Sequence, residues 1–179
     1  MKLKKLTKIK NEIAKIIDEN QDIKRYCTYL TNTPLLSMGM NADGKMQKQP
    51  NLTSSIIDKN IIPYRFMEDI LANSEVIIFV YFDEAELSKQ SLGSYIFFID
   101  VFVPKPYDVL KEIGQERNVE IATTISDLLD SEKLPKGLSL GEVDVVHARQ
   151  SRLSNKSNYT VLSLTLEIKG SNFRVGEYR

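Results

Sequence analysis

Cysteine and histidine each occur only once in this chain of 179 residues, as Cys27 and His147. A single cysteine cannot form a disulfide within the chain, and it cannot supply the ligand set of a structural zinc site. A single histidine excludes a multi-histidine metal site and catalysis by a pair of histidines. We therefore expect a reducing compartment, no metal, no cofactor and no catalytic residues. His147 is predicted to be a strand residue whose ring is satisfied.

An excess of charge of either sign is also lacking, because 24 lysines and arginines balance 24 aspartates and glutamates. A general nucleic-acid-binding protein carries a basic excess, so this balance argues against that class. No apolar run approaches the ~20 residues that a membrane helix needs. The basic start MKLKKLTKIK is followed by polar residues, among them Asn11 and Glu12, where a signal peptide would be apolar. We expect a soluble protein made in a cytoplasm.

Three stretches have the apolar spacing of an amphipathic helix. In residues 3–19 and 116–130, isoleucine and leucine recur every three or four positions. A shorter helix is predicted from Asp22, as its cap, to Leu30, and Thr33-Pro34 ends it.

Residues 37–55 have no period and are rich in glycine, asparagine, glutamine and lysine. Loops longer than ~12–15 residues are usually functional or disordered. Two interpretations stay open: a mobile surface excursion, or a segment that is mobile in the free subunit and becomes ordered on docking.

Four strands are predicted, at residues 76–82, 95–103, 143–149 and 159–168. With the long helix 116–130 between the second and third, the order is β-β-α-β-β. This order predicts an α+β fold: a four-stranded, mainly antiparallel sheet with one long helix packed on it, plus N-terminal helices. We divide the chain into residues 1–75 (helices and polar loop), 76–170 (core domain) and 171–179 (polar C-terminal tail).

The strand at residues 95–103 is apolar on both faces, whereas a strand with one wet face should alternate. Its single charge, Asp100, shares its face with Ile96, Phe98 and Phe102. An unpaired carboxylate avoids a sealed core, so we expect this face to point away from the long helix. Its predicted cover is either the N-terminal helices or a neighbouring subunit, because large apolar patches mark interfaces.

A nuclease-like pattern provides one enzymatic alternative. Asp144 on one strand, with Glu167 and Lys169 on the next, matches the arrangement in which two carboxylates hold Mg²⁺ beside a lysine. Glu167 and Lys169 share one strand face because they are two residues apart. An alternating Glu and Lys is also typical of a solvated strand end. No supporting helical glutamate or basic groove accompanies the pattern.

Charges of opposite sign gather in different parts of the chain. An acidic turn contains Asp83, Glu84 and Glu86, and a basic segment contains Arg149, Arg152 and Lys156. Complementary patches on a neutral chain favour head-to-tail self-association. Scattered solvated charge is the competing interpretation.

Several features of residues 22–168 occur in an order that resembles a known family. They are DIKRYCTYLTNTPLL with Asn32 and Pro34, IIDKNIIPYRF, VIIFVYFD, FFIDVFVP, the helix entered by Arg117, and Gly137–Gly141 before the last hairpin. Together they resemble neck proteins of tailed bacteriophages, in the head–tail joining or tail-completion (tail terminator-like) family. The helix before residue 22 and the polar segment 37–55 depart from that family.

The resemblance implies a structural virion protein with an α+β fold and no enzymatic activity. Such proteins form rings, sixfold or twelvefold, that join the DNA-filled head to the tail. The implied partners are further copies of the chain, portal-side adaptor or stopper proteins and the tail tube protein. DNA would pass through the ring without sequence-specific binding, and no membrane is involved. The implied location is the virion neck, and the host cytoplasm during assembly. The interface residues we predict are Ile96, Phe98, Phe102 and the two charged patches.

Overall fold

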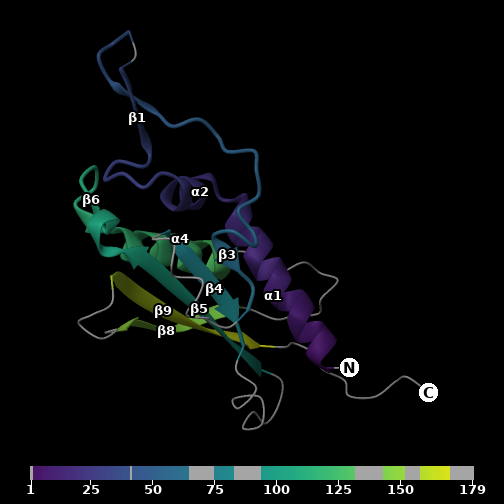
Figure 1. The fold of residues 1–179 in the computed structure, drawn as a ribbon. Coiled ribbons are helices and arrows are strands. Elements are labelled where there is room, and N and C mark those ends of the chain that lie inside the picture. Colours follow the sequence, from purple (N-terminus) through teal and green to yellow (C-terminus); the bar gives the residue numbers. More distant parts are fainter. Residues whose placement is uncertain are drawn as a thin grey trace.

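The computed structural model describes residues 2–40, 42–64, 75–82, 94–131, 143–151 and 158–169 (Figure 1). Its helices are α1 (Lys2–Glu19), α2 (Gln21–Thr28) and α4 (Arg117–Ser131), with a 3₁₀ turn at Lys105–Tyr107. Its strands are β1 (Leu36–Met40), β2 (Met46–Lys48), β3 (Ile61–Ile62), β4 (Ile77–Tyr81), β5 (Ser94–Pro104), β6 (Val109–Leu110), β7 (Gln115–Glu116), β8 (Val143–Ser151) and β9 (Tyr159–Lys169).

The central sheet has the strand order β3-β4-β5-β9-β8. Strands β4, β5, β9 and β8 pair antiparallel, as predicted, and α4 lies between β5 and β8 in the chain. The α+β fold in β-β-α-β-β order is therefore confirmed. The sheet has one more strand than predicted, because the two-residue β3 adds to β4 in parallel. Pro63, which follows β3 directly, cannot donate to a ladder and keeps this strand short.

One face of the sheet is covered by α1, α2 and α4. Phe97 and Ile99 of β5 pack in the same core as Ile13 of α1, Ile23 of α2 and Ile121 of α4. Each such side chain contributes roughly 1.5–3 kcal/mol when it is fully buried. The helices predicted at residues 3–19 and 116–130 are confirmed, and the N-terminal helices share this core with the sheet.

The opposite face carries a second buried apolar cluster. Phe79 and Phe102 meet edge to face with ring centroids 5.3 Å apart, and Phe102 lies 6.3 Å from Tyr159. Strand β5 is therefore apolar on both faces because each face contributes to a core. The helices lie on the other face, so they are not the cover of this one. Phe102 is only 4% exposed within its own chain.

The prediction of one long loop at residues 37–55 is wrong, because β1, which begins at Leu36, and β2 form an antiparallel hairpin there. The missed signal is Asp43-Gly44, a turn dipeptide. Gly44 has a φ of +74°, which a side chain disfavours.

No helix of the described ranges has the length and apolar character to cross a membrane. The C-terminal tail at 171–179 lies outside those ranges.

Candidate interaction surfaces

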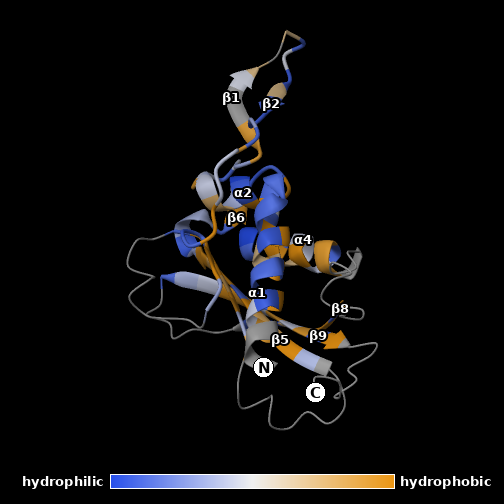
Figure 2. Ribbon diagram, turned by 90° about the vertical axis from the view of Figure 1, so that its right-hand side faces the viewer, coloured by the Kyte–Doolittle hydropathy of each residue, from blue (hydrophilic) through white to orange (hydrophobic). Residues whose placement is uncertain are grey.

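The β1–β2 hairpin projects away from the helices and the sheet (Figure 1; Figure 2). We call residues 36–50 the arm. Met40 and Met46 pair across its two strands and are 70% and 46% exposed. A two-stranded hairpin without a core is marginally stable by itself in water. The stability of the arm therefore depends on the residues that hold its base and on any surface that its tip contacts.

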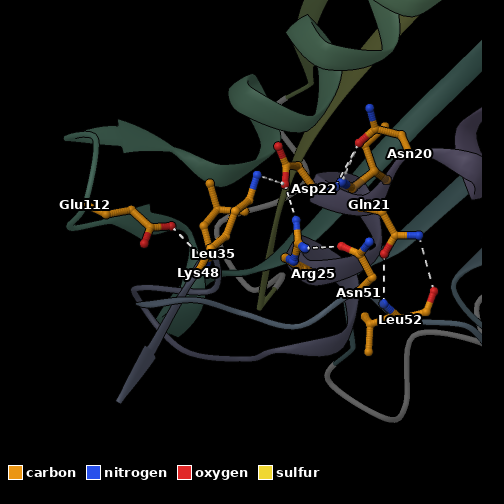
Figure 3. Close-up of polar contacts among 10 residues, drawn as sticks. Asn20, Gln21, Asp22, Arg25, Leu35, Lys48, Asn51, Leu52 and Glu112 are labelled. Atoms are coloured by element: carbon orange, nitrogen blue, oxygen red, sulfur yellow. Dashed lines mark hydrogen bonds and ion pairs between the residues drawn. The ribbon is translucent and has the colours of Figure 1, made fainter. Parts of the chain in front are cut away.

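Helix α2 holds the chain that returns from the arm (Figure 3). The Gln21 side chain accepts a hydrogen bond from the backbone N of Leu52 at 2.8 Å and donates one to its carbonyl at 3.3 Å. Lys24 Nζ donates to the Ser54 carbonyl at 2.9 Å. These bonds fix residues 52–54 against the helix because they use backbone groups of the segment that returns from the arm.

An ionic cluster continues this attachment into the arm (Figure 3). The carboxylate of Asp22 pairs with Arg25 and with Lys48 Nζ, the latter at 3.1 Å. Arg25 is buried, and its second terminal nitrogen donates to Asn51 Oδ1 at 2.7 Å. Asp22 stands in the first turn of α2, where the helix dipole favours a negative charge.

The start of α2 is capped by Asn20, not by Asp22 as predicted. Asn20 Oδ1 accepts hydrogen bonds from the backbone N of Asp22 and of Ile23, at 3.0 and 2.9 Å. Both residue types are good caps, so the sequence alone did not distinguish them. The consequence is that the Asp22 carboxylate is available for Arg25 and Lys48.

The β6–β7 hairpin supports the other side of the arm base (Figure 3). Glu112 Oε1 accepts from the Leu35 backbone N at 3.2 Å, and Lys111 N donates to the Asn32 carbonyl at 2.9 Å. Burial raises the pKa of the Glu112 carboxyl. The arm base is thus fixed from two elements that are distant in sequence.

Arg117 links α4 to the end of α2 and is fully buried. One terminal nitrogen donates to the carbonyls of Tyr26 and Tyr29 at 2.9 and 3.1 Å, and the other donates to that of Thr31. A guanidinium at this position satisfies carbonyls that a helix C-terminus leaves unpaired and complements its negative dipole end. Burial lowers the pKa of Arg117. The sequence showed Arg117 only as the entry to a helix, because its partners are backbone atoms.

Cys27 lies in the same region and is buried. Burial raises the pKa of its thiol to about 12, so the thiol stays protonated and unreactive.

The outer face of the sheet, opposite the helices, carries part of the predicted interface. Ile96 and Phe98 are half-buried there, whereas Phe102 is covered. The ring of Phe98 stacks on Tyr81 at 5.6 Å, and the Tyr81 hydroxyl donates to Asp100 at 2.8 Å. As parity predicts, these side chains point away from α4. Asp100 is tolerated because it has this partner.

The other predicted residues divide between described and undescribed parts of the chain. On the outer face, Asp144 pairs in register with Glu167, and His147 with Thr165. His147 and Arg149 are exposed on β8. The described residues include no group of three or more His, Cys, Asp or Glu placed to hold a metal. The predicted residues that lie outside the described part of the chain are Asp83, Glu84, Glu86, Arg152 and Lys156, and the side chain of Lys169 also lies outside it.

We predict that hydrogen exchange will divide residues 37–55 of the free subunit into two parts. The backbone amides of Gln49 and Leu52 are bonded to Leu35 and Gln21, so they should exchange slowly. The amides of the turn at 42–45 should exchange fast, because the arm tip has no core. This prediction is checked by letting the intact chain exchange and then measuring deuterium in its fragments by mass spectrometry. Uniformly fast exchange up to residue 54 would contradict the fixed base.

A family model, YomW, matches residues 20–168. No curated protein and no solved structure matches the chain.

Proposed function

Since the chain belongs to the phage-derived YomW family, we propose that it is a structural protein of the virion neck. In this role it forms an oligomeric ring that joins the DNA-filled head to the tail. The observation that carries the proposal is the arm, an exposed hairpin that projects from a body that fixes its base. A hairpin of this kind gains stability from a partner, which suits a chain that completes its packing in an assembly.

The outer face of the sheet supports the same proposal. Ile96 and Phe98 keep part of their surface exposed on a face that the helices leave uncovered. Partly exposed apolar side chains that lie together on one face are typical of protein contact surfaces. Arg149, exposed on the edge strand β8, adds a charge of the kind that orients a neighbouring subunit.

The proposed ring is sixfold or twelvefold, with a portal-side adaptor or stopper protein on one side and the tail tube protein on the other. DNA passes through without sequence-specific contacts, which agrees with the zero formal net charge. We further propose that the protein has no enzymatic activity, cofactor or metal. It acts in the virion neck, after assembly in the host cytoplasm.

Native mass measurement of the purified chain, with and without the tail tube protein of the same phage, tests the proposal. We expect one homogeneous ring, either alone or on addition of the tail tube protein. A chain that stays monomeric under both conditions would contradict the ring.

A metal-dependent nuclease is the second candidate, and one observation favours it. Asp144 and Glu167 are directly paired across β8 and β9, so their carboxylates lie on one face. Two carboxylates beside Lys169 would form the catalytic set of such an enzyme.

Incubation of the chain with DNA and Mg²⁺ decides between the two candidates. We expect no cleavage above that of the Asp144→Ala and Glu167→Ala variants, because no third metal-binding side chain of the described residues joins the pair. Cleavage that needs Mg²⁺ and disappears in both variants would overturn the structural role.

A further inference from the structure

The turn at the tip of the arm contains a residue pair that occurs once in the chain. Asp43 precedes Gly44, and no other aspartate or asparagine of the 179 residues is followed by glycine. The pair favours a tight hairpin turn, because glycine accepts the backbone angles that such a turn needs. The same pair is chemically reactive, since the carboxyl group of an aspartate here lies beside a backbone nitrogen that no side chain shields.

We propose that Asp43 is a site of spontaneous isomerisation to isoaspartate, through a cyclic imide that its side chain forms with the backbone N of Gly44. The modification needs neither an enzyme nor a partner chain. It is therefore independent of the proposed ring, because it requires only the turn at the arm tip and water.

The reaction consumes and returns one water molecule. The Gly44 N attacks Cγ of the protonated Asp43 carboxyl, and the new N–C bond forms while the hydroxyl group leaves with the proton of the nitrogen as water. Water then adds to one of the two imide carbonyls. Addition at Cγ breaks the new bond and restores aspartate. Addition at the main-chain carbonyl breaks the original peptide bond, so Gly44 stays attached through Cγ and the α-carboxylate becomes the side group.

The structure gives the carboxyl access to the nitrogen. Asp43 and Gly44 are both exposed. Gly44 has a φ of +74°, and a Cβ placed on it would meet no atom within 4 Å. The turn belongs to a two-stranded hairpin that is marginally stable by itself, so its backbone can rotate into the geometry of ring closure at low cost.

Asp58 provides a matched comparison, because it is also an exposed aspartate in a turn. Its own N donates to the Ile61 carbonyl at 2.9 Å, and the N of Lys59, which would have to attack, donates to the Ile56 carbonyl at 3.3 Å. Both isoleucines are buried, so this turn is fixed to the core. The side chain of Lys59 also crowds the attacking nitrogen. Asp58 should therefore stay unchanged while Asp43 reacts.

Isoaspartate at position 43 would change the tip of the arm and leave its base intact. The main chain then runs through the side-chain carbons of residue 43 and gains one methylene group. The register of a hairpin is set by the length of its turn, so the pairing of Met40 with Met46 should be disturbed. The bonds between Gln21 and Leu52 lie at the other end of the arm and should persist.

Ageing of the intact chain at physiological temperature and neutral pH tests the proposal. Samples taken over several weeks are digested, and electron-transfer fragmentation distinguishes isoaspartate from aspartate at each position. We expect isoaspartate to accumulate at position 43 faster than at any other position, Asp58 included. A fragment that contains residues 43 and 44 and is lighter by one water molecule should appear as the imide intermediate.

Two variants separate the reaction from a general loosening of the arm. Gly44→Ala places a methyl group beside the attacking nitrogen, and isoaspartate at position 43 should form severalfold more slowly. Alanine also tolerates the φ of Gly44 poorly, so a rate set by looseness of the turn alone would rise instead. Asp43→Glu keeps the charge but would have to close a larger ring, so no imide is expected.

Nuclear magnetic resonance measures the effect on the arm in the same samples. In the aged wild-type chain, the amide signals of Met40 and Met46 should divide into two sets, and the second set should grow with the isoaspartate fraction. The signal of Leu52 should stay single, and all three should stay single in aged Asp43→Glu.

Three results would overturn the proposal. One is an aged chain whose isoaspartate content at position 43 does not exceed that at Asp58. Another is a Gly44→Ala chain that reacts as fast as the wild type, which would exclude the route through an unshielded nitrogen. The third is isoaspartate at position 43 with unchanged signals of Met40 and Met46, which would exclude the change of register.

Discussion

Replacing Arg117 with methionine is expected to lower the free energy of unfolding by about 4 kcal/mol, the largest effect that we predict for a single polar side chain. The guanidinium pairs with three backbone carbonyls at the end of α2 and is fully buried. Methionine fills a similar volume but removes the donors to the Tyr26 and Thr31 carbonyls, whereas the Tyr29 carbonyl keeps its bond from the Thr31 N. Each buried acceptor without a partner costs about 1–3 kcal/mol. Urea denaturation, at unchanged denaturant slope, measures the difference.

Two controls make this result specific. Arg117→Lys keeps the charge but lacks the fork that reaches several carbonyls, so an intermediate loss is expected. Lys111→Met removes an exposed base from the neighbouring hairpin and should change stability by less than about 0.5 kcal/mol. The arm base should also loosen in Arg117→Met, with faster exchange at Leu52. A loss below about 1 kcal/mol in Arg117→Met would contradict the role of this side chain as a helix cap.

Phe97→Lys is expected to unfold the chain, whereas Phe98→Lys should give a soluble, folded subunit that no longer assembles. Phe97 is fully buried among the helices, and a lysine there would place an unpaired charge in the core. The adjacent Phe98 points to the outer face and is only half-buried, stacked on Tyr81. A lysine at 98 can reach solvent with its amine while its stem covers the ring.

Circular dichroism and native mass spectrometry distinguish the two phenylalanine variants. The pair is matched, since it makes the same substitution at neighbouring positions of one strand. If both variants unfold alike, β5 is core on both faces along its whole length. The outer face would then not be a subunit interface, and the arm would have to supply the contacts.

The sheet and the long helices were predictable from sequence because their signals are local. Strand β9 alternates, α1 and α4 repeat every three or four residues, and the parity of Asp100 indicated how β5 faces. The burial of Phe102 was not predictable, since it depends on Phe79 and Tyr159 meeting across three strands. The sequence of an apolar strand face does not reveal which of its side chains are covered by other residues of the same chain.

The arm and its base were largely invisible in the sequence for a different reason. Composition suggested a loop, and only Asp43-Gly44 indicated a hairpin. The side chains that fix the arm base from outside, among them Gln21 and Glu112, bond to backbone atoms, and such partners have no residue identity to recognise. The β6–β7 hairpin was missed because two-residue strands carry no measurable period.

Deleting the gene for this chain from the phage genome that carries it tests the central claim most directly. The particles would be counted by electron microscopy after induction, with the intact gene supplied from a plasmid as the control. A neck protein predicts DNA-filled heads and complete tails that remain unjoined, and the plasmid should restore tailed particles. Normal yields of joined, tailed particles without the gene would contradict the claim.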